Sequence, residues 1–185
     1  VYQMQDDYTY IITNYHVVYD ASASAANGGY MARKIVCYLY GSEGSPASAG
    51  VGSDGYAAYD YGSYAIECEY VGGSISNDIA IVRAKTDDIL AKNPNVTTAT
   101  FASEYHVGET AIAIGNPEGE GISVTEGIVS VDNEYINLQI DKTVRSYRSL
   151  RIDTAIYGGS SGGGLFNLKG ELIGITNAGN TTDQN

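Results

Sequence analysis

Three residue types that can together cleave an acyl bond occur in this chain in the order His16, Asp78 and Ser161. Serine is a weak nucleophile at its own pKa, so it needs a neighbouring base to take its proton, and imidazole has a suitable pKa. The imidazole in turn needs a carboxylate that holds its tautomer and stabilises the imidazolium. The sequence therefore predicts acyl transfer, with Ser161 as nucleophile, His16 as base and Asp78 as the orienting carboxylate.

The nucleophile candidate lies in the stretch Gly159-Ser160-Ser161-Gly162-Gly163-Gly164-Leu165. Glycines let the backbone turn sharply and leave its N–H groups free to point at a substrate. The apolar strand expected at 163–168 gives this turn a rigid footing. Gly/Ser runs are more often linkers, so this motif indicates a nucleophile only in combination with the histidine and aspartate upstream.

Each of the three residues also has a structural interpretation. His16 could be a hydrogen-bonded residue at a strand end, Asp78 a turn residue or cap, and Ser161 part of a linker. Their coincidence, in order and on strand-bounded segments, favours the catalytic interpretation. The second histidine, His106, lies in a polar loop and is interpreted as a surface residue.

Many short β-rich segments separated by glycine-rich turns indicate an all-β protein. Strands are expected at 8–13, 34–40, 64–71, 78–84, 110–114, 123–131, 134–140, 163–168 and 171–176. Residues 41–63 lack periodicity, which predicts a long surface loop. The best helix signal is a short turn after His16, and residues 86–100 are expected to connect two halves.

Composition limits the kinds of partner. The 185 residues include 22 acidic and 10 basic side chains, for a formal net charge of −12. An acidic surface repels phosphates, which argues against nucleic acid and anionic lipid. No apolar run reaches the length of a membrane span. No cofactor or metal is expected, and Cys37 and Cys68, on segments expected to pair, could form a cross-strand disulfide or stay free and buried.

Five ordered segments resemble the trypsin-like serine proteases, in the form used by the bacterial HtrA/Deg branch. They read TNYHVV (13–18), NDIAIV (77–82), VGE…AIGNP (107–117), SVTEGIVS (123–130) and DTAI…GSSGG (153–163). The resemblance covers nearly the whole chain. It implies two perpendicular six-stranded antiparallel β-barrels with the active site in the cleft between them.

The resemblance also implies a domain organisation. Residues 1–88 would form an N-terminal barrel with the histidine and aspartate, 89–104 a connection, and 105–185 a C-terminal barrel with the serine, together one protease domain. The family has further segments before the first residue and after Gly179, so both ends are expected to be truncated, or the barrels completed by another chain. The opening Val1-Tyr2-Gln3 has no signal peptide or initiator methionine, so a piece cut from a longer protein is expected.

The roles of further residues follow from the same resemblance. The backbone N–H groups of Gly159 and Ser161 would form the oxyanion hole. The specificity pocket would have Ala155 at its base and a wall that includes Ile175, Thr176 and Asn177. A small neutral base predicts cleavage after small or medium aliphatic residues, with no attraction for Arg or Lys.

The chain departs from the family pattern in three places. Gly164 replaces a proline, residues 157–160 replace Asn-Pro-Gly-Asn, and the 41–63 segment is longer than the usual turn. Because Gly158 and Gly159 loosen the serine loop, a catalytically silent or self-inhibited binding module on a protease fold stays open as the alternative. A viral chymotrypsin-like protease would need a different histidine and Gly-Asn-Pro context.

The resemblance implies a serine endopeptidase that acts on polypeptide substrates. It also implies a bacterial, extracytoplasmic protein, either secreted or anchored at the cell surface. A PDZ domain or membrane anchor in the full-length protein and a homo-oligomer are compatible with the family pattern.

Overall fold

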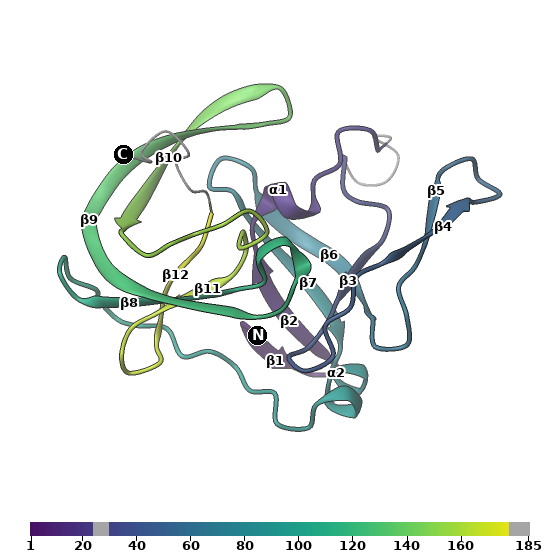
Figure 1. Cartoon of the computed structure of the whole chain (residues 1–185), viewed down its shortest axis with the longest axis horizontal. Coiled ribbons are helices and arrows are strands. Elements are labelled where there is room, and N and C mark those ends of the chain that lie inside the picture. Colours follow the sequence, from purple (N-terminus) through teal and green to yellow (C-terminus); the bar gives the residue numbers. More distant parts are fainter. Residues whose placement is uncertain (24–29, 178–185) are drawn as a thin grey trace.

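The computed structural model describes residues 1–23 and 30–177, which form two curved β-sheets and a two-stranded arm (Figure 1). The first sheet is antiparallel, in the order β1-β2-β7-β6-β3. Its strands are β1 (Gln3–Gln5), β2 (Tyr8–Thr13), β3 (Ile35–Cys37), β6 (Ile66–Ser74) and β7 (Ile79–Lys85). Alternate residues of β7 are buried, so one face of this sheet covers a core of its own.

The second sheet is also antiparallel, in the order β10-β9-β8-β11-β12. Its strands are β8 (Thr110–Gly115), β9 (Ser123–Ile140), β10 (Thr143–Ile152), β11 (Gly164–Phe166) and β12 (Leu172–Ile175). Its core is separate from the first and is built on Ala111, Ala113, Val129 and Leu165. Each half of the chain therefore buries its own apolar face.

The expected all-β, trypsin-like fold is confirmed, with a difference in strand number. Within the described residues each sheet has five strands, where the barrels were expected to have six. Apart from the two-stranded arm, the described residues add only isolated bridges, Tyr19 with Met31 and Phe101 with Leu172. These single bridges do not extend into a sixth strand.

The prediction that residues 41–63 form a surface loop is wrong. They contain β4 (Ala47–Val51) and β5 (Ala57–Asp60), which pair as an antiparallel arm. A turn joins the strands, because the Gly52 N–H donates to the Tyr56 carbonyl (2.8 Å). Nearly every residue of both strands is exposed, so no apolar face produced an alternating pattern in the sequence.

Several other boundaries differ from the expectations. Strands expected at 123–131 and 134–140 are one continuous strand, β9, and its partner β10 was not expected. The segment expected as a connection begins with α2 (Thr86–Lys92), and a 3₁₀ turn, η2, spans Pro117–Gly119. The short turn near the histidine is α1 (Tyr15–Val18). In the described part of the chain, no helix is long and apolar enough to cross a bilayer.

Candidate active site

His16 is held from two directions by one carboxylate. It follows β2 in the single-turn helix α1, where its backbone N–H donates to Asp78 Oδ1 (2.8 Å). Its ring Nδ1 lies 2.7 Å from Asp78 Oδ2. The imidazole is 34% exposed while Asp78 is fully buried, so the ring is fixed on one side and open on the other. With Nδ1 as the donor to Asp78, Nε2 is left to accept a proton.

Asp78 is the last residue of the turn before β7 and has a left-handed conformation, with φ of +50°. Aspartate tolerates this region better than most residues. The buried Asn14 amide donates to the Asp78 carbonyl (3.0 Å), and this contact holds the turn against the end of β2. The carboxylate accepts a third hydrogen bond from Asn177 Nδ2 (2.6 Å) besides the two from His16. The buried charge is thus well compensated.

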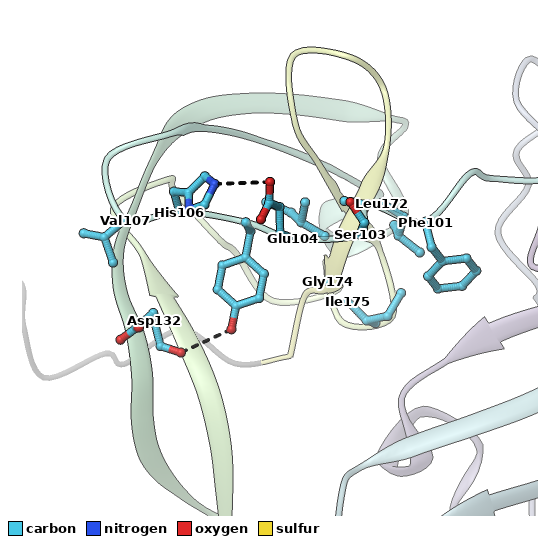
Figure 2. Close-up of a pocket in the computed structure, with 12 residues that line it drawn as sticks. Phe101, Ser103, Glu104, His106, Val107, Asp132, Leu172, Gly174 and Ile175 are labelled. Atoms are coloured by element: carbon cyan, nitrogen blue, oxygen red, sulfur yellow. Dashed lines mark hydrogen bonds and ion pairs between the residues drawn. The ribbon is translucent and has the colours of Figure 1, made fainter.

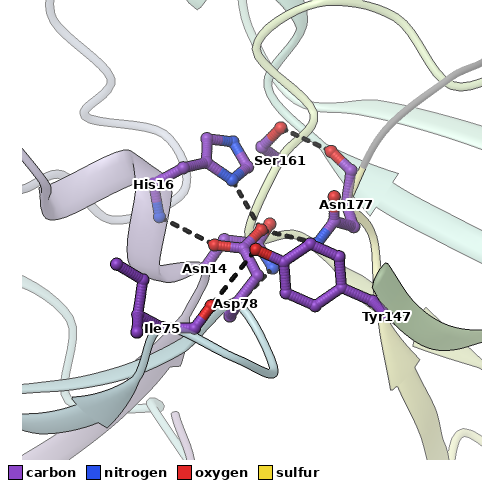
Figure 3. Close-up of polar contacts among 7 residues, drawn as sticks. All are labelled: Asn14, His16, Ile75, Asp78, Tyr147, Ser161 and Asn177. Atoms are coloured by element: carbon purple, nitrogen blue, oxygen red, sulfur yellow. Dashed lines mark hydrogen bonds and ion pairs between the residues drawn. The ribbon is translucent and has the colours of Figure 1, made fainter. Parts of the chain in front are cut away.

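Ser161 lies in the loop that leads into β11. Its hydroxyl donates to the backbone carbonyl of Asn177 (2.7 Å), and the Asn177 amide binds Asp78 (Figure 3). The neighbouring Gly162 has φ of +83°, and a side chain there would collide with Thr13 on β2. The serine loop therefore packs against the strand end that carries His16. Ser161, Asp78 and His16 belong to one chain of hydrogen bonds.

The serine and the imidazole are not directly bonded. In the described residues, no hydrogen bond joins Ser161 Oγ to His16, and the hydroxyl proton points to the Asn177 carbonyl instead. Proton transfer to the imidazole therefore requires the hydroxyl to rotate away from this carbonyl.

The loop around Ser161 is fixed by its own backbone. The Ser160 N–H donates to the Tyr157 carbonyl (3.0 Å), and the Gly162 N–H donates to the Thr176 carbonyl (2.9 Å). By contrast, the N–H groups of Gly159 and Ser161 take part in no hydrogen bond with any described residue. Two free N–H groups beside a hydroxyl are the donors that an oxyanion needs.

A small cavity of about 10 Å³ lies beside the serine loop. Its lining includes Ala155, Thr176 and Ser160. The Thr176 hydroxyl donates to the Ser160 carbonyl (2.5 Å), and the Ala155 carbonyl accepts the hydroxyl of Thr125 (2.9 Å). A cavity of this size holds about one water-sized group.

Two residues expected in the pocket wall do not line this small cavity. Ile175 borders a separate cavity of about 570 Å³, together with Phe101 and Leu172 (Figure 2). The Asn177 side chain turns to Asp78. The reason is the alternation of an extended chain, which sends Thr176 to one side and its two neighbours to the other.

The second histidine and both cysteines lie outside this site. His106 borders the larger cavity and is 69% exposed, which confirms its interpretation as a surface residue.

Cys37 and Cys68 are free thiols, diagonal to each other across the β3–β6 pair. The Cys68 thiol, as a hydrogen-bond donor, lowers the pKa of Cys37, while that bond and burial raise the pKa of Cys68. Among the described residues, no cluster of His, Cys, Asp and Glu is arranged to hold a metal ion.

Sequence reasoning missed two residues that support the site and misplaced a third. Asn14 holds the Asp78 turn, and its place in the histidine motif was the available signal. Tyr147, buried on β10, donates to the Ile75 carbonyl (3.1 Å), and burial and the nearby Asp78 charge raise its pKa. Nothing local in the sequence marks Tyr147. Asn177 was expected to contact substrate, whereas its amide binds the carboxylate.

The two antiparallel sheets, with these polar groups at their junction, define a trypsin-like all-β fold. A family model described as "Trypsin-like peptidase domain" matches residues 2–175, and the chain belongs to that family. The resemblance to the HtrA/Deg branch is confirmed by named relatives. "Serine protease Do-like HtrA" of Lactococcus lactis subsp. cremoris (strain MG1363) is 28% identical over 189 residues, covering 100% of this chain and 37% of its own length.

Other relatives and a solved structure are also named as HtrA-type or Do-like serine proteases. "Serine protease Do-like HtrB" of Bacillus subtilis (strain 168) is 31% identical over 178 residues, which cover 95% of this chain and 31% of the relative. "Probable periplasmic serine protease do/HhoA-like" of Haemophilus influenzae (strain ATCC 51907 / DSM 11121 / KW20 / Rd) is 40% identical over 114 residues, which cover 60% of this chain and 22% of the relative. An HtrA-type protease solved with a decapeptide matches with a TM-score of 0.59 and 25% identity, covering 94% of this chain and 40% of that one. The chain spans about a third of the length of these curated relatives.

Proposed function

We propose that this chain is the catalytic domain of a serine endopeptidase that hydrolyses peptide bonds through Ser161, His16 and Asp78. The observation that carries the proposal is the 2.7 Å contact between His16 Nδ1 and Asp78 Oδ2, with Ser161 tied to the same carboxylate through Asn177. A buried carboxylate that fixes one imidazole nitrogen leaves the other as a base.

The proposed reaction begins when the Ser161 hydroxyl rotates from the Asn177 carbonyl toward His16 Nε2. The serine oxygen attacks the scissile carbonyl carbon as Nε2 takes its proton, and the N–H groups of Gly159 and Ser161 stabilise the oxyanion. His16 then gives the proton to the leaving amine, and the C–N bond breaks. Water, deprotonated by His16, attacks the acyl-enzyme, and the proton returns to Ser161 as the acid leaves.

Cleavage after small or medium aliphatic residues is the specificity we propose. The support is the small cavity beside Ser160, which has Ala155 in its lining and no acidic side chain among its lining residues. A neutral, narrow pocket gives an Arg or Lys side chain no partner for its charge. A panel of chromogenic peptides that differ only at the cleaved position tests this. Faster turnover with Arg or Lys than with Ala or Val would overturn it.

Labelling with a fluorophosphonate probe tests the proposed chemistry directly, because the probe reacts covalently with an activated serine. We expect the label on Ser161, located by peptide mass mapping, and no label in Ser161→Ala or His16→Ala. The adjacent Ser160 is buried and serves as the matched control, so Ser160→Ala should keep the label. Label on another residue, or undiminished peptide turnover in Ser161→Ala, would remove Ser161 from the mechanism.

A self-inhibited or catalytically silent binding module is the second candidate. The observation that favours it is the Ser161 hydroxyl bound to the Asn177 carbonyl in place of the imidazole. A self-inhibited enzyme should label slowly, and faster when a substrate peptide is bound. A silent module should bind peptides without any labelling.

The setting of the whole protein is also a proposal. We propose a bacterial, extracytoplasmic protease, secreted or anchored at the cell surface, because a 40% identical relative is named periplasmic. Because the chain spans about a third of its relatives, a PDZ domain, an anchor or a homo-oligomer fits the proposal. Fractionation of cells that express the full-length protein tests its location.

A further inference from the structure

The β4–β5 arm stands away from the first sheet (Figure 1). All five residues of β4 and three of the four in β5 are exposed. Two-stranded hairpins are marginally stable on their own, and they gain stability from further strands or from packing. The arm therefore offers two exposed faces and two free strand edges.

Tyrosine is concentrated in and beside this arm. Residues 38–64 hold six of the chain's 17 tyrosines, at positions 38, 40, 56, 59, 61 and 64. Four of them are largely exposed: Tyr40 (79%), Tyr64 (58%), Tyr59 (50%) and Tyr56 (48%). Tyrosine among serine and glycine is the composition of protein-binding loops, because the rigid ring gives contact area at low entropic cost.

One face of the arm is both aromatic and apolar. Tyr59 and Tyr61 are two residues apart, and their ring centroids lie 6.2 Å from each other. Val51 on β4 lies opposite Ala57, whose side chain is on the same face of β5 as that of Tyr59. Val51 is 73% exposed. Exposed aromatic and apolar side chains grouped on one face are typical of a binding site.

The charge around these rings selects the kind of partner. Residues 38–64 contain Glu43, Asp54 and Asp60, and no lysine or arginine. Cations from elsewhere in the chain lie over three of the rings: the Arg33 guanidinium is 3.4 Å from the centre of Tyr56, the Lys34 ammonium is 5.1 Å from that of Tyr61, and the Lys92 ammonium is 5.4 Å from that of Tyr64. Such contacts are attractive, because the face of the ring is electronegative. Arg33 also pairs with Asp54 (3.0 Å), so the groups of the arm left without a basic partner among the described residues are the ring of Tyr59 and the carboxylate of Asp60. These two groups suit a cationic partner.

We propose that the β4–β5 arm is a docking surface for an extended polypeptide segment rich in lysine and arginine. The segment's backbone pairs with a free edge of the arm. Because successive residues of a strand point to opposite faces, one of its cations meets the exposed ring of Tyr59 on one face, and the next meets the carboxylate of Asp60 on the other. Charge complementarity selects this occupant, since the chain is acidic overall and Tyr59 and Asp60 have no basic partner among the described residues. The proposal does not depend on proteolytic activity.

Binding of labelled peptides to the whole chain tests this proposal. The protein carries Ser161→Ala so that no probe is cut, and the probe is a fluorescein-labelled peptide of repeated Gly-Lys-Lys units, which places lysines on both faces of an extended chain. We expect it to bind more tightly than matched glycine–glutamate and glycine–serine peptides, and more weakly as salt rises. Tyr59→Ser should weaken binding about two- to fivefold, the range of an exposed cation–π contact. Asp60→Asn keeps the side-chain size and should also weaken it.

Tyr135→Ser provides the matched control, because Tyr135 is 68% exposed on β9, in the other sheet. It should bind the lysine peptide as the parent does. Equal loss in Tyr59→Ser and Tyr135→Ser, or equal affinity for the glutamate peptide, would overturn the proposal. Self-association in sedimentation that Tyr59→Ser abolishes would also overturn it, in favour of a second copy as the occupant.

Discussion

Removal of the Asn177 amide should loosen the carboxylate that holds the candidate base. In the structure, Asn177 Nδ2 donates to the buried Asp78 Oδ2 at 2.6 Å. A hydrogen bond to a charged group contributes about 1.5–3 kcal/mol. Asn177→Ala also removes a buried side-chain oxygen, Oδ1, that has no partner among the described residues, which returns about 1 kcal/mol. The expected net loss in the free energy of unfolding is about 0.5–2 kcal/mol.

Urea denaturation followed by circular dichroism measures this loss. The matched control is Asn133→Ala, because the Asn133 amide oxygen makes an exposed hydrogen bond with Arg148, and it should change stability by less than about 0.5 kcal/mol. Peptide turnover by Asn177→Ala should fall about tenfold, if about 1.4 kcal/mol of transition-state stabilisation is lost with the amide.

Asn177→Asp distinguishes hydrogen bonding from packing. It keeps the side-chain shape but brings a second carboxylate against Asp78, where like charges repel. Turnover near pH 7 should therefore fall further than in Asn177→Ala and recover in part as the pH is lowered. Wild-type stability in Asn177→Ala, or an Asp variant as active as the parent, would refute the role assigned to this amide.

Three further substitutions test other parts of the site. Asp78→Asn should lower kcat about 10⁴-fold with the fold retained, because the amide favours the wrong imidazole tautomer; single-turnover kinetics checks this, and a loss below tenfold would contradict it. Gly162→Ala should destabilise the protein by at least about 1–2 kcal/mol in thermal unfolding, since φ is +83° and a side chain meets β2, whereas Gly158→Ala, in open space, should be nearly neutral. Because the pKa of Cys37 is lowered by the Cys68 thiol, its alkylation by iodoacetamide should begin at a lower pH than that of an ordinary thiol, and Cys68→Ala should move the onset upward; an unchanged pH profile would count against the thiol contact.

Much of the fold could be predicted from the sequence where the signal is local. The strand that ends before His16 and the strand that follows Asp78 have the apolar character of half-buried strands, and both formed near the expected positions. The β4–β5 arm could not be predicted in this way. Its strands bury neither face, so their order depends on a glycine turn and not on periodicity.

The candidate site was harder to predict where it depends on the direction of a side chain. The contact between His16 and Asp78 joins residues far apart in the chain, and the motif around each one indicated it. Side chains alternate between the two faces of the extended chain that follows β12, so the face on which the Asn177 side chain lies depends on the register. A shift of one residue would place it on the other face. The Ser161 rotamer depends on a carbonyl 16 residues away, which no local pattern encodes.

The sheets have separate cores, and the reactive groups are divided between them. His16, in α1 after β2, and Asp78, in the turn before β7, are attached to the first sheet, while Ser161 lies in the loop before β11 of the second. The Tyr147 hydroxyl and the Asn177 amide reach from the second half to the first. A small slide of one half past the other would therefore misalign nucleophile and base without melting either core. The rate of the proposed hydrolysis would therefore depend on how the two halves are placed relative to each other. A molecule that changes this placement would lower the rate while leaving the melting temperature of each half unchanged.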